Sequence, residues 1–127
     1  MRYLLDSHAL LWTLNGSPRL TAKMRLALDE PEAEVWFSSA AAYELGLQVT
    51  LRRLPPFPRP IQVVATELGL RELLINSEHA GHAASLALIH RDPWDRMIAA
   101  QAIIEGMVVV TRDAEVAALG ARTFWRQ

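Results

Sequence analysis

The fold is decided by the opening stretch of the chain, which reads RYLLDSHALLW over residues 2–12. Its first four residues form a short apolar run that is typical of a strand buried on both faces of a sheet. Asp6 and Ser7 follow this run directly, and either side chain could cap a helix. The apolar residues that come next fit a first helix over 9–14. The stretch therefore predicts a strand that leads into a helix through an acidic residue.

The same alternation of strands and helices continues along the rest of the chain. Further strands are predicted at residues 34–37, 71–75 and 107–110, with an edge strand at 122–125. Further helices are predicted at residues 22–28, 39–50, 61–68, 78–88, 94–105 and 114–119, with Thr21, Ser38 or Ser39, and Ser77 as caps. This order predicts one α/β domain over residues 1–127, in which a central, mostly parallel sheet carries helices on both faces.

The composition limits the classes of function. Hydrophobic residues make up 51% of the 127 residues and the net charge is -1, so any contact with a nucleic acid must come from local basic patches or through bound cations. The chain has no cysteine, which excludes a disulfide scaffold, a thiolate zinc site and a cysteine nucleophile. We find neither a secretory signal nor an apolar stretch of the ~20 residues that a membrane span needs, and we expect a cytoplasmic protein without a membrane span.

Four acidic residues stand where their side chains are expected to meet. In an open parallel sheet, ligands bind outside the carboxyl ends of the strands. Asp6 follows the first strand, and Asp113 follows the fourth. Glu44 lies inside the helix after the second strand, and Asp95 lies in the first turn of a later helix. Each acid could also be an ordinary helix cap or an exposed helix residue, so the expectation rests on the convergence of all four.

Convergent carboxylates predict a metal site. Like charges packed together raise one another's pKa unless a cation offsets them, and a site of carboxylates alone suits Mg²⁺ or Mn²⁺ rather than zinc. Such an ion can lower the pKa of a bound water, orient it in line with a phosphodiester and stabilise the departing oxygen. Ser7 and Thr111 could hydrogen-bond the carboxylates, although capping and turn formation would explain them as well.

Three stretches carry a resemblance to a known family. They read LLDSHALLW at residues 4–12, HRDPWDRMI at 90–98 and VTRD at 110–113. In content and order they resemble the signature blocks of PIN-domain proteins and, more narrowly, of the VapC-type toxins of toxin–antitoxin modules. The resemblance spans essentially the whole chain. It implies a PIN-like three-layer fold and an endoribonuclease that depends on Mg²⁺ or Mn²⁺.

The resemblance also assigns roles to individual residues. Carried over by position, Asp6, Glu44 and Asp95 become metal ligands, and Asp113 becomes a second-metal or water-mediated ligand. The implied partners are an RNA substrate, a cognate VapB-type antitoxin that lays a C-terminal segment over the site, and a second copy of the chain in a homodimer. We expect the antitoxin to use a groove between the first helix and the helix that carries Glu44, where three apolar anchors are available: Trp12, Leu45 and Val49.

The sequence departs from the family pattern at three places. Ser7 stands where threonine is commoner, Tyr43 where tryptophan is usual, and Gln48 where lysine is frequent. None of these changes removes an acid. Arg96 and Arg112 lie beside the implied ligands and could either hold RNA phosphate or pair with the acids.

Other functions fit less well or remain open. An aspartyl-phosphate phosphatase needs a second aspartate two residues after Asp6, where this chain has His8, and a receiver domain needs a late lysine, whereas Lys23 is the only lysine. A PIN-type nuclease that acts on another nucleic acid remains an alternative, as does a binding module with a decayed catalytic site.

Overall fold

The strands of the computed structural model, which describes residues 1–127, form one sheet in which every pairing is parallel. The strands are β1 (Arg2–Leu5), β2 (Glu34–Ser38), β3 (Arg71–Leu73), β4 (Val108–Val110) and β5 (Thr123–Phe124). Their order across the sheet is β3-β2-β1-β4-β5. The parallel sheet expected from the sequence is confirmed, with β3, β4 and β5 one or two residues shorter than predicted.

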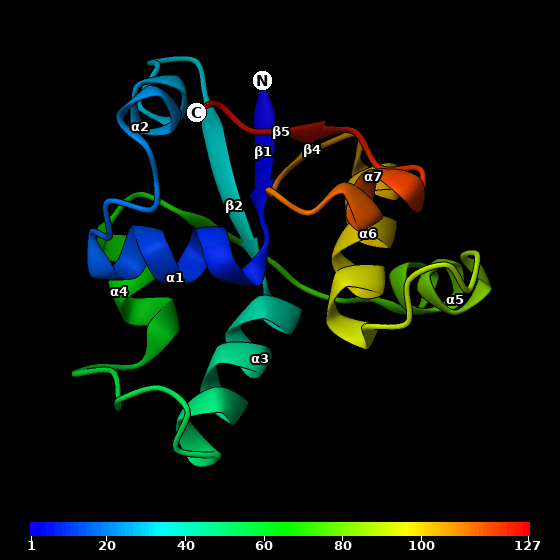
Figure 1. The fold of residues 1–127 in the computed structure, drawn as a ribbon, viewed down its shortest axis with the longest axis horizontal. Helices are drawn as coiled ribbons and strands as arrows, with labels where there is room; N and C mark the ends of the chain where they lie inside the picture. Colours follow the sequence, from blue (N-terminus) through cyan, green and yellow to red (C-terminus); the bar gives the residue numbers. More distant parts are fainter.

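Helices cover both faces of this sheet. They are α1 (Ser7–Asn15), α2 (Ala22–Leu28), α3 (Ser39–Thr50), α4 (Ile61–Glu67), α5 (Ser77–Ser85), α6 (Pro93–Glu105) and α7 (Ala114–Ala118). In Figure 1, α1, α2 and α4 lie on one side of β1 and β2, and α5, α6 and α7 lie on the other. Tyr3, Leu4 and Leu5 are consecutive in β1 and all buried, as only a strand covered on both faces allows.

The topology creates a switch point between β1 and β4. From β1 the chain builds β2 and β3 on one side, and it then returns across the sheet to place β4 on the other side. Ligands of open α/β sheets bind in the crevice outside the carboxyl ends of the strands at such a point. Leu5 is paired with Val110, and the Asp6 N–H donates to the Val110 carbonyl at 3.1 Å. The ends of β1 and β4 therefore bring Asp6 beside Thr111.

Helix α5 starts one residue away from its predicted cap. Asn76, not Ser77, is the N-cap, because its side-chain oxygen accepts from the His79 backbone N–H at 2.9 Å. The His79 Nδ1 accepts in return from the Asn76 N–H at 3.1 Å. This reciprocal pair satisfies two N–H groups that the first turn leaves free.

Helix α5 also ends at Ser85, whereas the sequence predicted an end near residue 88. The reason lies in α6, from which the buried Arg96 guanidinium reaches the chain that follows α5. Its two terminal nitrogens donate to five backbone carbonyls at 2.7–3.3 Å, namely those of Ala83, Ala84, Leu86, Ala87 and His90. The Arg96 side chain thus takes the place of the backbone N–H groups that would bond these carbonyls in a longer helix. The chain can therefore leave the helix after Ser85.

Candidate active site

Asp6 is the most enclosed of the four acids. It is only 6% exposed, and as the N-cap of α1 it accepts from the Ala9 N–H through Oδ1 at 2.7 Å. Burial raises the pKa of the Asp6 carboxyl, against the lowering effects of hydrogen bonds from Thr111 and Ala9, and the charge of Glu44 raises it further. Asp6 is thus both a helix cap and a buried carboxylate at the switch point. The capping role expected from the sequence is confirmed, and the role of Asp6 as a metal ligand stays a prediction.

Glu44 reaches the same region from α3. The Ser7 hydroxyl, at the start of α1, donates to Glu44 Oε1 at 2.6 Å and ties the two helices together. Burial raises the pKa of the Glu44 carboxyl, the Ser7 bond lowers it, and the charges of Asp92 and Asp95 raise it. Ser7 and Thr111 therefore do lie against the acids, as the sequence suggested.

Asp95 projects from the first turn of α6. The N-cap of that helix is Asp92, whose Oδ1 accepts from the N–H groups of Trp94 and Asp95. Burial raises the pKa of the Asp95 carboxyl, a bond from His90 lowers it, and the charges of Asp92 and Asp6 raise it again. Asp6, Glu44 and Asp95 are thus linked by mutual repulsion, although they come from three separate helices.

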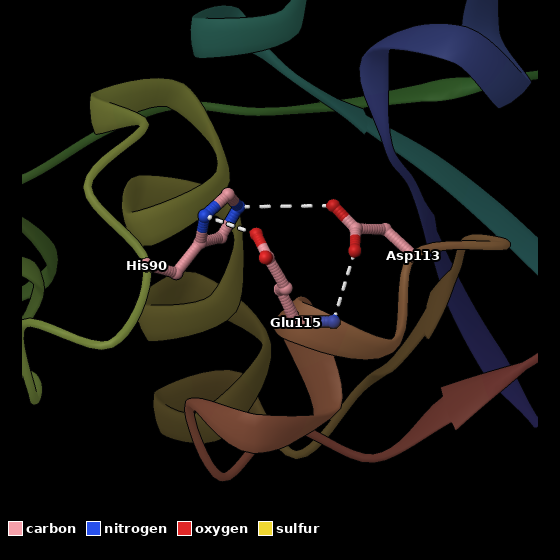
Figure 2. Close-up of side chains that lie close together, drawn as sticks. All are labelled: His90, Asp113 and Glu115. Carbon is pink, nitrogen blue, oxygen red and sulfur yellow. Dashed lines mark hydrogen bonds and ion pairs between the residues drawn. The ribbon is translucent and has the colours of Figure 1, made fainter.

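Asp113 stands slightly apart from this group. As the N-cap of α7 it accepts from the Glu115 N–H at 2.9 Å, and its side chain is 42% exposed. Figure 2 shows that the His90 imidazole faces both residues, with Nε2 3.8 Å from Asp113 Oδ2 and Nδ1 2.9 Å from Glu115 Oε2. His90, Asp113 and Glu115 offer possible ligand atoms within 4.8 Å of one another, a spacing that Asp6, Glu44 and Asp95 do not all share.

Only one basic side chain pairs with Asp6, Glu44 or Asp95, because the His90 imidazole lies 2.8 Å from Asp95 Oδ2. No arginine or lysine forms an ion pair with Asp6, Glu44 or Asp95. Buried carboxylates are ordinarily paired with a base or bound to a metal, and this donor set of oxygens matches the preference of Mg²⁺ and Mn²⁺. The residues present therefore fit a hard divalent cation.

Arg96 needs a correction. The sequence offered it as a contact for RNA phosphate or as a partner of the acids, but its guanidinium is buried and donates to five carbonyls in the last turn of α5 and in the loop after it. Arg96 is a structural residue that faces away from the acids. Leu45, expected as an anchor for a partner, is also wrong in that role, because it is 3% exposed and lies in the core.

Two hollows flank the acids and share one residue. The first, of about 290 Å³, is lined by Asp6, His8, Trp12, Arg112 and Asp113. The second, of about 220 Å³, lies between α1 and α3 and is lined by Ser7, His8, Leu11, Glu44, Leu45, Gln48, Arg53 and Leu54. His8 borders both, and each hollow contains one arginine, whereas Asp95 lines neither of them. A larger hollow of about 410 Å³, between α1, α2 and β2, contains none of the four acids.

Sequence reasoning missed three residues at this site. His90 comes five positions before Asp95 and turns back to reach it through the loop before α6. Glu115 lies two positions after Asp113, a spacing that would suggest a shared turn. Arg53 follows α3 in a turn, and no sequence pattern indicates that it returns to the hollow beside Glu44.

A comparison with known families identifies the family of the chain that carries this site. The PIN domain family matches residues 3–121 of the chain. The protein belongs to the PIN domain family. The match covers β1 through α7, and this PIN domain thus contains all four acids. No curated protein matches the sequence significantly. None of the helices is both long and apolar enough to span a membrane.

Solved structures share the fold of this PIN domain. One is VapBC2 from Rickettsia felis, bound to a DNA fragment from the promoter of VapBC2. A chain of this structure matches with a TM-score of 0.72 and 16% identity over 98% of both chains. FitAcB from Neisseria gonorrhoeae gives a TM-score of 0.68 and 24% identity, covering 97% of this chain and 96% of that one. A toxin–antitoxin complex from Klebsiella pneumoniae gives a TM-score of 0.61 and 19% identity, covering 91% of this chain and 90% of that one. The expected PIN-like fold is confirmed.

Proposed function

We propose that this PIN domain is a Mg²⁺- or Mn²⁺-dependent endoribonuclease and the toxin of a toxin–antitoxin module. The observation that carries the proposal is the group of carboxylates at the β1–β4 switch point, of which Asp6 is buried and Glu44 and Asp95 are half-buried, with no arginine or lysine to balance their charge. A polyanionic substrate could approach such a group only with cations in place, which agrees with the net charge of -1.

Asp6, Glu44 and Asp95 are the residues that would hold the metal. The bond from Ser7 fixes Glu44, while Thr111 and the Ala9 N–H fix Asp6, so both carboxylates are oriented before any ion binds. When bound, the ion supplies an activated water for attack on a phosphodiester and neutralises charge on the phosphate. Preorganised ligands keep the cost of assembling the site low.

Asp113 and Arg112 would act at the substrate side of the site. Both line the hollow that contains Asp6, and the Asp113 side chain is 42% exposed. We assign Asp113 a second-metal or water-mediated role. The Arg112 guanidinium carbon lies 5.8 Å from the centre of the Trp125 ring, and from there it can bind a phosphate of the RNA.

The proposed partner is a VapB-type antitoxin. The similar structures from Rickettsia felis and Neisseria gonorrhoeae are VapBC2 and FitAcB, and the one from Klebsiella pneumoniae is a toxin–antitoxin complex. We also propose that the chain forms a homodimer in the cytoplasm. Its exposed apolar residues include Leu74 and Ile75 before α5 and Leu88 and Ile89 after it, a distribution that favours burial against a second protein surface.

The test is a cleavage assay on the purified protein. We expect cut products from labelled single-stranded RNA with Mg²⁺ or Mn²⁺ and none with a chelator, because without a cation the carboxylates would repel the phosphodiester and could not stabilise the departing oxygen. Structured RNA and DNA of the same sequence should be assayed in parallel. Cleavage of DNA alone would favour the alternative of another nucleic acid, and the absence of metal-dependent cleavage of any substrate would favour a decayed binding module.

The free energy of unfolding should fall as the pH rises and should increase when metal binds. Asp6, Glu44 and Asp95 have raised pKa values, chiefly through burial. A carboxyl whose pKa is raised by folding stabilises the fold fully below its ordinary pKa, and this stabilisation is lost as the pH rises through the raised value. The melting temperature of metal-free protein is therefore expected to fall as the pH rises from the ordinary carboxyl range towards neutrality.

Metal should reverse this loss. At neutral pH, Mg²⁺ well above its dissociation constant is expected to raise the free energy of unfolding on the order of 1–3 kcal/mol. Thermal melting with and without chelator across this pH range measures both effects. A melting temperature that ignores Mg²⁺ at concentrations that support cleavage would contradict a shared carboxylate site.

A further inference from the structure

The loop before α6 is attached to that helix at two adjacent positions. Arg96 holds its backbone by donating to the carbonyls of Ala87 and His90 at 2.7 and 3.0 Å. Asp95, the preceding residue on the helix, accepts from the imidazole of His90 at 2.8 Å. The backbone and the side chain of His90 are thus both bound to one turn of α6.

This attachment leaves the His90 ring little freedom. Its side chain is 11% exposed, and its two nitrogens face three carboxylates, of which Asp113 is the most distant, with Oδ2 3.8 Å from Nε2. Nε2 lies 2.8 Å from Asp95 Oδ2, and Nδ1 lies 2.9 Å from Glu115 Oε2 on α7 (Figure 2 shows the Glu115 side). Since a carboxylate can only accept, Nε2 donates to Asp95. The bond occupies only one of the two oxygens of Asp95 and leaves Oδ1 for another ligand.

We propose that His90 is a positioning residue that holds Asp95 in the orientation needed to bind the metal. The inference rests on the proposed function and deepens it, because it assigns to His90 the role of supporting a metal ligand rather than that of a further ligand. Hydrogen-bond partners behind metal ligands ordinarily contribute 10–100-fold to metal affinity, since they fix the ligand before the ion arrives. Asp6 and Glu44 have such partners in the Ala9 N–H and the Ser7 hydroxyl, and His90 is the corresponding partner of Asp95.

The geometry of the two nitrogens allows a sharp test. The side-chain nitrogen of glutamine is separated from the backbone by the same number of bonds as Nε2 of histidine. The side-chain nitrogen of asparagine is separated from the backbone by the same number of bonds as Nδ1 of histidine. His90→Gln can therefore keep the bond to Asp95, whereas His90→Asn can keep only the one to Glu115. A residue that merely stabilised the loop would not distinguish glutamine from asparagine in this way.

The experiment measures Mn²⁺ binding to the purified chain by isothermal titration and electron paramagnetic resonance, together with the melting temperature of each metal-free variant. We expect His90→Ala and His90→Asn to weaken Mn²⁺ binding by about 10-fold or more, and His90→Gln to weaken it by roughly threefold at most, because only glutamine can keep the bond to Asp95. If wild-type protein binds no Mn²⁺, the proposed function fails and this inference falls with it.

Three results would overturn the positioning role while leaving the proposed function intact. The first is Mn²⁺ binding by His90→Ala that is as tight as in the wild type or tighter, which would mean that the imidazole does not support the site. The second is equal weakening by glutamine and asparagine. The third is a nitrogen coupling in the resonance spectrum of bound Mn²⁺, which would place His90 itself in the coordination shell.

Discussion

Asp6→Asn is expected to reduce metal-dependent RNA cleavage by about 100-fold or more, a larger loss than removal of an outer hydrogen-bond partner produces. The fold should survive the change. Asparagine caps helices as well as aspartate does, so the bond from the Ala9 N–H to the side-chain oxygen can remain. Because burial raises the pKa of Asp6, removal of its charge should leave the melting temperature of metal-free protein unchanged or higher at neutral pH.

Asp92→Asn is the matched control for this variant. Asp92 is also a helix N-cap, and its charge also raises the pKa of neighbouring acids, but its Oδ1 is occupied by the backbone of α6. We expect it to keep most of the cleavage activity. Asp95→Asn should resemble Asp6→Asn. Cleavage rates and melting curves of the three variants test the metal-site model, which would fail if Asp6→Asn cut as fast as the wild type or if Asp92→Asn lost as much activity as Asp6→Asn.

The parts of the fold that are local in sequence could be predicted. The apolar run before Asp6 and the run before Thr111 indicated buried parallel strands, and the carboxyl-end rule then placed Asp6 and Asp113 near one edge of the sheet. Caps such as Thr21 and Ser38 follow from the preference of hydroxyl side chains for unpaired N–H groups. These features depend on a few neighbouring residues.

The parts that depend on tertiary contacts could not be predicted. Nothing in the sequence gives the strand order, so the switch point between β1 and β4 emerges only from the structure. Arg96 stands next to Asp95 and resembles a site residue, but helical geometry turns neighbouring side chains in different directions, and Arg96 reaches the end of α5 instead. His90 belongs to the site because that same contact bends the chain back towards α6.

The surface beside the acids indicates how a partner could block them. Asp6 and Asp113 line one hollow, and Glu44 lines the other, with His8 between them. An arginine from the partner could pair with these carboxylates, since a planar guanidinium forms strong bidentate bonds with them. Apolar contacts would come from the half-buried Trp12, Leu11 and Leu54 at the rims of the hollows, because Leu45 lies in the core and Val49 lines a separate hollow near Phe57.

Expression of this chain alone is expected to arrest bacterial growth, and co-expression of the protein encoded beside it is expected to restore growth. We expect that neighbour to have a DNA-binding N-terminal half and a flexible basic C-terminal tail that enters the hollows. The test is to induce the wild-type chain and Asp6→Asn, each alone and each together with the neighbour. Viable cells are then counted. Asp6→Asn should be harmless at equal expression while still binding the neighbour, which separates cleavage from assembly. A wild-type chain that is harmless at levels where its cleavage of RNA is measurable in vitro would contradict the toxin role and leave the nuclease standing.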